Sequence, residues 1–317
     1  MGRLHSRILE KNDIEEITNK SAIRTIWQTN PLIEKSLADT ASKKYLSSII
    51  SDSKSLGIFE NNELVGIIIG NIPEWDSKYF GYDSYFVKNV WSDSTENLRL
   101  LLESLNEHLI DWKIKYVYSK IPANSKNAIR AFEEAGYLMA DFRITLNKEL
   151  DFPNKFPIDY GDFQFRLALK EEDQEIAELC RNVSKINRFH SDPLIPTRVA
   201  DDIYYWWIIN GLKSGKDTIV GTYGSKIVAF HMSYPEPEIS IDGNPLLSFT
   251  DILGVDSEFG KMGLGRKLFE NYFALAISQG CKSAVSGVHA NNVPSMRLHE
   301  GLGYRTIYSE IGLRKWY

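Results

Sequence analysis

Short apolar runs bounded by turn residues recur in both halves of this chain. Residues 57–70 (GIFENNELVGIIIG) predict two strands joined at Asn61-Asn62, because two apolar runs are separated by residues that favour a tight turn. Residues 218–233 (TIVGTYGSKIVAFHMS) have the same form. Each half of the chain is therefore expected to contain a β-hairpin.

Longer amphipathic stretches predict one long helix in each half. Apolar positions recur at helical spacing over about 94–112 and about 265–279. Two apolar runs, 246–255 and 283–289, predict the strands that precede and follow the second of these helices. Helices and strands mix without strict alternation, which favours an α+β fold with mixed sheets flanked by helices.

The two halves also resemble each other residue by residue. Residues 124–137 read NSKNAIRAFEEAGY, and residues 291–304 read NNVPSMRLHEGLGY. At an offset of 167, five of these fourteen positions are identical: Asn124/Asn291, Arg130/Arg297, Glu133/Glu300, Gly136/Gly303 and Tyr137/Tyr304. The alternative, chance similarity of two amphipathic helices that end at a glycine, explains the glycine but not the other matches. A duplicated unit is expected.

A change in composition near residue 151 marks the boundary between the repeats. Residues 151–163 (DFPNKFPIDYGDF) are rich in proline and glycine and show no clear period. We interpret this stretch as a linker or a crossing strand. It predicts two domains, 1–150 and 151–317, which agrees with a length of 317 residues.

Composition narrows the classes of function. The chain is 43% hydrophobic and 25% charged with a net charge of −5, which predicts a folded protein with no general affinity for nucleic acid or an anionic membrane. No stretch has the length of a membrane span. The two cysteines, Cys180 and Cys281, predict neither a disulfide framework nor a metal site, so we expect a cytoplasmic protein.

The stretch GKMGLGRKLF, residues 260–269, places three glycines ahead of a helical pattern. It lacks the Gly-Lys-Ser/Thr of a phosphate-binding P-loop, and Leu268 replaces the third glycine of a dinucleotide fingerprint. What remains is a run of backbone N–H groups at a helix start, which suits an anion. The alternative is an ordinary helix start with flexible residues.

These residues together resemble the GNAT acyltransferases. The resemblance rests on the strand ILGV (252–255), the turn GKMGLG (260–265), and Asn292, Ser295, His299 and Gly303-Tyr304 at the family's spacing. It implies acetyl-CoA as co-substrate, with its pyrophosphate on the turn and its pantetheine between two splayed strands. Two positions depart from the family: Gly260 stands where Arg or Gln is usual, and His299 where tyrosine is common.

Carried over position by position, the resemblance implies which residues bind the cofactor. They are Leu253, Gly254, Val255, Gly260, Lys261, Met262, Gly263, Leu264, Gly265, Arg266, Asn292, Ser295 and His299. In the first half, residues 90–100 (VWSDSTENLRL) hold no glycine where this turn should be. We therefore expect tandem GNAT-type domains, of which the N-terminal copy is degenerate and binds no acetyl-CoA.

A narrower resemblance concerns the acceptor. Residues 187–212, 75–81 and 310–316 are similar to the substrate-side segments of dTDP-fucosamine-type (dTDP-4-amino-4,6-dideoxygalactose) N-acetyltransferases. The most specific part is Arg-Phe-His-x-Asp-Pro at 188–193. This resemblance implies a small-molecule amine, the amino group of a nucleotide-linked amino-deoxysugar.

The family's chemistry suggests roles for several residues. The backbone N–H of Val255 would stabilise the oxyanion, and His299 would protonate the leaving thiolate unless it only fills a helix face. Two residues are candidates for the general base: His190, which we prefer, and Asp251.

Three further residues are substrate-binding candidates, each with a structural alternative. Arg188 would hold a nucleotide pyrophosphate or form a surface ion pair. Asp192 would orient His190 or cap a turn before proline. Trp207, in the run YYWW (204–207), would stack on the nucleotide or lie in a helix core.

The sequence therefore predicts an acetyl-CoA-dependent N-acetyltransferase, monomeric or homodimeric, that uses no metal. Two alternatives remain. One is a GNAT enzyme acting on a different amine: an amino acid, peptide N-terminus, polyamine or antibiotic. The other is an acyl-CoA-binding module without catalysis, which the departures at Gly260 and His299 keep open.

Overall fold

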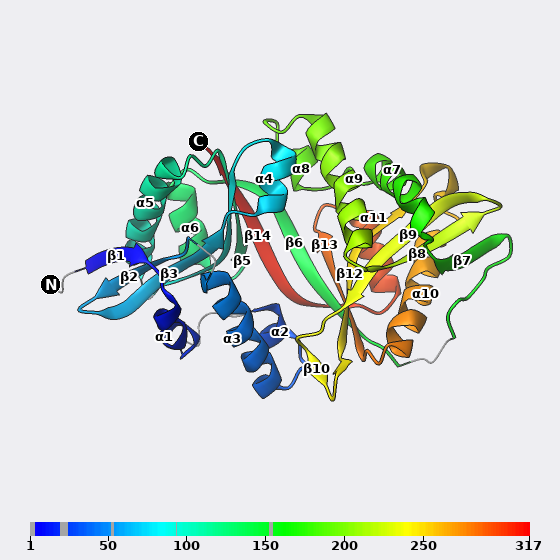
Figure 1. The fold of residues 1–317 in the computed structure, drawn as a ribbon, viewed down its shortest axis with the longest axis horizontal. Coiled ribbons are helices and arrows are strands. Elements are labelled where there is room, and N and C mark those ends of the chain that lie inside the picture. Colours follow the sequence, from blue (N-terminus) through cyan, green and yellow to red (C-terminus); the bar gives the residue numbers. More distant parts are fainter. Residues whose placement is uncertain (1–3, 20–24, 52–53, 93, 152–154) are drawn as a thin grey trace. The chain divides into compact units, whose positions relative to one another are not determined.

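The computed structural model divides the chain into two compact units (Figure 1). Unit 1 contains Met1–Arg143 and Tyr308–Tyr317, and unit 2 contains Ile144–Ile307. The structure describes residues 4–19, 25–51, 54–92, 94–151 and 155–317. Residues 152–154 of the predicted linker lie outside this part of the chain.

Unit 1 is a mixed sheet with helices. Its elements are β1 (Leu4–Ile8), η1 (Lys11–Asp13), α1 (Ile14–Asn19), α2 (Ile26–Thr29), α3 (Lys35–Ser51), β2 (Leu56–Glu60), β3 (Glu63–Asn71), α4 (Glu74–Phe80), β4 (Ser84–Ser92), α5 (Thr95–Asp111), β5 (Tyr116–Pro122) and α6 (Lys126–Glu134). The strands follow the order β1-β2-β3-β4-β5, and β14 (Arg305–Trp316) pairs with β5. The β4–β5 pair is parallel and the others are antiparallel.

Unit 2 repeats this plan. Its elements are β7 (Phe163–Leu167), η2 (Lys170–Glu172), α7 (Asp173–Val183), α8 (Arg188–Ser191), α9 (Thr197–Lys213), β8 (Asp217–Tyr223), β9 (Lys226–Pro235), the hairpin β10 (Ser240–Ile241) and β11 (Asn244–Pro245), β12 (Leu247–Val255), η3 (Ser257–Phe259), α10 (Leu264–Ser278), β13 (Ser283–His289) and α11 (Val293–Gly301). The strand order is β6-β13-β12-β9-β8-β7, where β6 is Leu138–Glu149. The β12–β13 pair is parallel, and β12, β9, β8 and β7 pair antiparallel.

These arrangements confirm the predicted α+β class with a mixed sheet and the tandem organisation. Both hairpins form: β2–β3 turns through Asn61 and Asn62, which have φ of 50° and 71°, and β8–β9 is the second. The predicted long helices correspond to α5 and α10, and the predicted strand 283–289 is β13 to the residue.

The duplication extends to the bounds of the elements. Adding 167 to Tyr116–Pro122, Lys126–Glu134 and Leu138–Glu149 turns β5, α6 and β6 into β13, α11 and β14 (Ser283–His289, Val293–Gly301 and Arg305–Trp316). Each repeat therefore ends in the same strand–helix–strand sequence.

The last strand of each repeat ends in the unit formed by the other repeat. β6 passes into unit 2 at Ile144, where the side chain of Asn147 bonds that of Ser283 on β13. β14 passes into unit 1, where residues Glu310–Trp316 pair with β5. Unit 1 is consequently built from two separate segments of the chain, whereas unit 2 is one continuous segment. The predicted domains 1–150 and 151–317 describe the repeats along the chain and stay a prediction.

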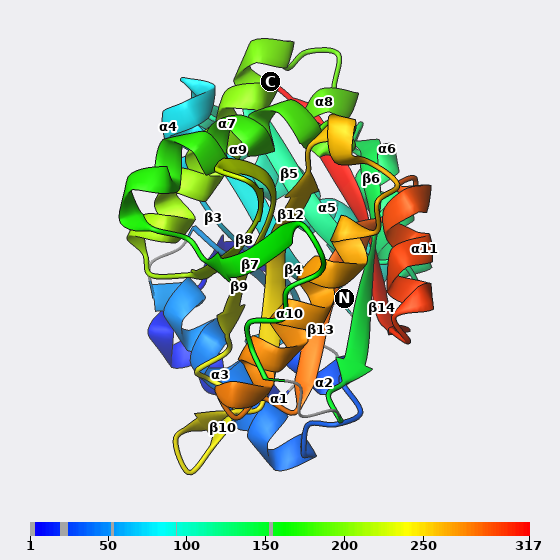
Figure 2. The ribbon, with the colours of Figure 1, turned by 90° about the vertical axis from the view of Figure 1, so that its right-hand side faces the viewer.

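Helices cover both faces of the sheet in unit 2 (Figure 2), and an apolar cluster lies on each face. On one face, α7 and α9 pack on Val220, Phe230 and Met232. On the other, α10 packs on the alternate positions Ile219 and Ala229. Residues of opposite parity face opposite helices because side chains alternate along a strand. The central strands β9 and β12 are thereby held between two layers of packed helices.

Candidate active site

The central feature of unit 2 is a gap between β12 and β13. The two strands pair in parallel only as far as Thr250↔Ser286. Beyond this pair, β12 continues to Val255 bonded to β9 alone, and β13 continues to His289. One edge of β12 is therefore left without a partner strand, as the predicted splayed strands require.

Backbone groups of β12 face this gap in a fixed alternation. The N–H of Asp256 donates to the carbonyl of Val228 on β9 at 2.8 Å. Since backbone groups of an antiparallel pair alternate in direction, the N–H of Gly254 also points to β9. Those of Leu253 and Val255 point away from β9, into the gap. The N–H of Val255 is thus free of the ladder, as the predicted oxyanion donor must be.

The glycine turn follows β12 directly and opens α10. After η3, Lys261 and Gly263 take the left-handed conformation, with φ of 64° and 76°. Gly263 is the N-cap residue and has no side chain to accept from the first-turn amides. The N–H groups of Leu264, Gly265 and Arg266 have no intrahelical acceptor, because a helix leaves its first amides unpaired. The helix start can therefore bind an anion, and Leu264 can contribute only its backbone because its side chain is buried.

Basic side chains around the turn are mostly engaged elsewhere. Arg266 donates to the carbonyl of Gly301 at the end of α11, at 2.8 Å. Lys267 lies over the rings of Tyr160 and Phe163, 5.2 Å from each centroid. Gly260, Lys261 and Met262 are exposed. The first-turn amides, rather than Arg266, are thus the groups left available to an anion at this turn.

Helix α11 arranges three predicted residues in one series of hydrogen bonds. The side chain of Asn292 caps the helix by accepting from the N–H of Ser295 at 3.2 Å. His299 Nδ1 lies 2.7 Å from the carbonyl oxygen of Ser295, and Nε2 lies 2.8 Å from Ser286 Oγ. A carbonyl oxygen only accepts, so Nδ1 carries the proton and Nε2 accepts from the hydroxyl.

This geometry bears on the proposed acid. His299 is 3% exposed, and burial lowers its pKa, although the bond to Ser295 opposes that shift. The ring is therefore neutral near pH 7 and offers no proton at Nε2. These contacts favour the alternative in which His299 packs the helix against the sheet, and its role as an acid stays a prediction.

The contacts of His190 connect α8 to α9. Its Nε2 lies 2.8 Å from Asp201 Oδ1, and its Nδ1 faces the side chain of Asn187, the N-cap of α8. Both ring nitrogens thus have protein partners. Asp192 is 4% exposed and accepts from the N–H of Leu194 at 3.0 Å, as a turn-capping residue does.

Arg188 and Trp207 differ in their surroundings. The guanidinium of Arg188 lies 4.1 Å from the ring centroid of its neighbour Phe189. The ring of Trp207 stacks on that of Tyr204 at 6.0 Å, and its Nε1 donates to Asp251 Oδ2 at 3.0 Å. The structure thus brings two predicted residues, Trp207 and Asp251, into contact.

Asp251 is placed by a β-bulge at the start of the gap. In the β12–β9 pair, Thr250 faces Ser233 and Ile252 faces Met232, so Asp251 is the extra residue. Its Oδ2 also accepts from Lys216 Nζ at 2.7 Å. Sequence analysis did not find Lys216; it follows α9 in a turn and belongs to no motif.

Unit 1 keeps the gap but not the anion site. β4 and β5 pair only up to Val87↔Ser119, and the next residue of β4, Lys88, is again the extra one opposite β3. A lysine thus replaces the aspartate of unit 2. At the start of α5, Ser94 Oγ accepts from the N–H of Asn97 at 3.1 Å, so a side chain occupies a first-turn amide. Both differences support the prediction of a degenerate copy.

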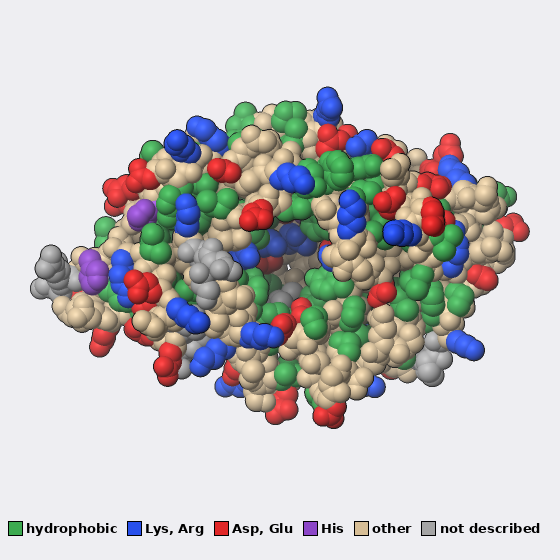
Figure 3. All heavy atoms as spheres, viewed as in Figure 1, with side chains coloured by type: hydrophobic (Ala, Val, Ile, Leu, Met, Phe, Trp, Pro, Cys, Tyr) green, Lys and Arg blue, Asp and Glu red, His purple; other side chains and the backbone are tan. Residues whose placement is uncertain are grey.

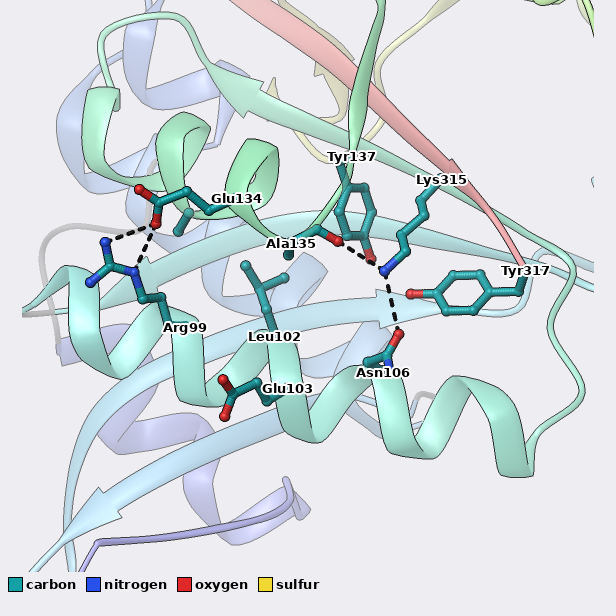
Figure 4. A pocket seen from close by; sticks show the side chains of 10 residues that line it. Arg99, Leu102, Glu103, Asn106, Glu134, Ala135, Tyr137, Lys315 and Tyr317 are labelled. Carbon is teal, nitrogen blue, oxygen red and sulfur yellow. Dashed lines mark hydrogen bonds and ion pairs between the residues drawn. The ribbon is translucent and has the colours of Figure 1, made fainter.

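A pocket of about 290 Å³ in unit 1 lies between α5, the end of α6 and the end of β14 (Figure 4). Lys315 Nζ donates to the carbonyl of Ala135 at 2.9 Å and lies 3.4 Å from Asn106 Oδ1. Burial lowers the pKa of Lys315. The lysine thereby caps the end of α6.

Acidic and basic side chains are interspersed on the face shown in Figure 3. Among the described residues, no helix has both the length and the apolar character needed to cross a bilayer. Nor do the described ranges bring together three His, Cys, Asp or Glu residues that could hold a metal ion.

Comparison with known proteins agrees with this geometry. Residues 183–304 match the model of the acetyltransferase (GNAT) family. The spore coat polysaccharide biosynthesis protein SpsD of Bacillus subtilis (strain 168) is 22% identical over 253 residues, which cover 79% of this chain and 83% of that protein.

Solved structures share the fold over nearly the whole chain. A GCN5-related N-acetyltransferase from Sphaerobacter thermophilus aligns with a TM-score of 0.67 and 14% identity, over 99% of this chain and 95% of its own. A tandem GNAT protein from the clavulanic acid biosynthesis pathway aligns with a TM-score of 0.62 and 11% identity, over 99% and 98%. The matched residues, 183–304, contain the gap, the glycine turn and α11, so the similarity to the acetyltransferase (GNAT) family covers the candidate site.

Proposed function

We propose that unit 2 transfers an acetyl group from acetyl-CoA to a primary amine, and that this amine belongs to a nucleotide-linked amino-deoxysugar. The observation that carries the proposal is the strand gap followed at once by the uncapped start of α10. An unpaired strand edge suits an amide-containing pantetheine arm, and the helix start suits its pyrophosphate.

The residues around the gap provide for acyl transfer. The N–H of Val255 faces the gap and would stabilise the oxyanion of the tetrahedral intermediate. Asp251, at the bulge, is the better placed of the two candidate bases, since both nitrogens of His190 are bonded within the protein. The remaining cofactor contacts are proposed at the turn amides and at α11.

The choice of acceptor rests on two similarities. Residues 187–212 resemble the substrate-side segment of sugar-nucleotide amine acetyltransferases, and a relative over 79% of the chain is a spore coat polysaccharide biosynthesis protein. Arg188 and Trp207 are the proposed acceptor contacts. Both cysteines are buried free thiols, which suits a cytoplasmic enzyme.

A panel of amines tests this function. The protein is incubated with acetyl-CoA and, separately, dTDP-4-amino-4,6-dideoxygalactose, a free amino sugar, a polyamine, an amino acid and a peptide with a free N-terminus. We expect thiol release and an acetylated product with the nucleotide sugar. Turnover on the other amines alone would contradict the acceptor class. Binding of acetyl-CoA without turnover on the panel would favour the non-catalytic module.

A further inference from the structure

The strongest side-chain cluster beside the gap is built around Asp251. Lys216 Nζ and Trp207 Nε1 both donate to Asp251 Oδ2, at 2.7 and 3.0 Å. The three residues come from different segments: the interior of α9, the loop before β8 and the bulge in β12. The Asp251 and Lys216 side chains are 10% and 29% exposed, so the pair is largely shielded from solvent.

The two donors leave the other carboxylate oxygen available. Among the hydrogen bonds of the described residues, Oδ1 of Asp251 receives none. It is also not among their buried side-chain atoms that lack a partner, so it retains contact with solvent. One oxygen is thus fixed by the protein and the other faces outward, at the point where β12 leaves β13.

Tyr234 packs against the Lys216 ammonium, and neither Tyr234 nor the nearby Cys180 carries a charge that competes with Asp251 for it. The Lys216 ammonium lies 4.6 Å from the ring centroid of Tyr234, which stacks on Phe249. Burial together with the charge of Asp251 raises the pKa of Cys180 to about 12 and also raises that of Tyr234. Both groups stay neutral near pH 7, which leaves Lys216 and Asp251 as the charged pair.

We propose that Lys216 and Trp207 are positioning residues that hold Oδ2 of Asp251 and turn Oδ1 toward the acceptor amine. The inference rests on the proposed function and identifies how its base is held. When the amine attacks the thioester carbonyl, the N–C bond forms. The proton released from nitrogen passes to Oδ1 and then to solvent. The C–S bond breaks, and the departing thiolate takes a proton from solvent.

The test replaces the ammonium and separates kcat from KM in the full-length enzyme. In Lys216→Met, kcat with the acceptor falls about tenfold or more near pH 7, because Asp251 is no longer held in place to accept the proton. The KM for acetyl-CoA stays unchanged. Lys216→Arg restores kcat. Trp207→Phe, which keeps the ring and removes the N–H, lowers kcat/KM while acetyl-CoA affinity stays unchanged.

A matched control separates this role from loss of an ion pair in general. Arg166 forms an ion pair with Glu172 at 2.5 Å, with side chains 39% and 16% exposed, on an edge strand of the same unit. Arg166→Met is expected to leave kcat unchanged. If Lys216→Met has the same kcat as Arg166→Met, the inference is wrong and the acetyltransferase assignment stands. A wild-type protein without turnover would instead overturn the proposed function.

Discussion

Two histidines in the core of unit 2 lack a carboxylate partner among their described contacts. His231 Nε2 lies 3.2 Å from Thr250 Oγ1, and His299 is bonded to Ser286 and Ser295. Burial, with His299 nearby, lowers the pKa of His231 to about 3. Both rings are held neutral by desolvation, because a buried charge without a counter-charge is costly.

This burial predicts how stability depends on pH. The folded pKa of His231 lies below its unfolded value of about 6.5, so between these values only the unfolded chain binds the proton. Above pH 6.5 both states leave His231 neutral, so the folded protein bears no penalty. As the pH falls toward 3, the free energy of unfolding decreases by at most about 1.4 kcal/mol per pH unit.

Denaturant unfolding of wild type and His231→Gln between pH 4.5 and 7 measures this contribution. The free-energy difference between the two proteins should shrink as the pH falls. His5→Gln, at an exposed position, is the control and should show a constant difference. A constant difference for His231→Gln as well would contradict the account.

At the scale of elements, helix starts distinguish the two units. α10 begins at a glycine without a capping side chain, whereas Ser94 caps α5 and Asn292 caps α11. A capped start is stabilised by its own side chain, and an uncapped one is available to a ligand. The same contrast separates the proposed cofactor site from the structural role of Asn292.

Removing a cap should cost stability in a predictable way. Asn292→Ala is expected to lower the free energy of unfolding by about 1 kcal/mol, because the N–H of Ser295 loses its acceptor. Asn292→Ser keeps a capping oxygen and should retain most of the stability. Chemical denaturation checks both variants. Equal stability of wild type and Asn292→Ala would show that the hydrogen bond is not a stabilising cap.

Local sequence patterns predicted most of the helices and strands, whereas contacts between residues distant in the sequence could not be predicted. The stretch at 283–289 was recognised as a strand from its own residues, and its Ala284, Val285 and Val288 are buried in β13. The bulge at Asp251 depends on pairing with β9, some 20 residues away in the chain, so no local signal marks it. Lys216 likewise meets Asp251 only once β8 and β12 are folded. The glycine turn was found because its amides act through the backbone.

At the scale of the whole molecule, each repeat gives its last strand to the unit formed by the other. The sequence predicted the duplication but not this exchange. β6 and β14 are equivalent strands of the two repeats, and their apolar patterns allow either placement. Register and partner choice depend on the surrounding structure, which a single strand does not encode.

The exchange predicts that fragments must be cut at unit rather than repeat boundaries. A fragment of residues 144–307 retains the segment 144–150, which holds the end of β6 and contributes the buried Leu146 and Leu150 to unit 2. A fragment of residues 151–307 lacks it and should be less stable by about 3 kcal/mol or more, from lost apolar burial. Urea unfolding of both fragments makes the comparison, and equal stabilities would contradict the assignment of β6 to unit 2.

The most direct test of the central claim concerns the charge at Gly263. A side chain there meets no atom within 4 Å, and asparagine and aspartate both tolerate its left-handed conformation. Calorimetry with acetyl-CoA should therefore compare Gly263→Asp with Gly263→Asn, which adds a side chain of the same size without the charge. Gly263→Asp should bind about tenfold or more weakly, because a carboxylate at the helix start repels the pyrophosphate. Equal affinities for the two variants would contradict diphosphate binding by the first amides of α10.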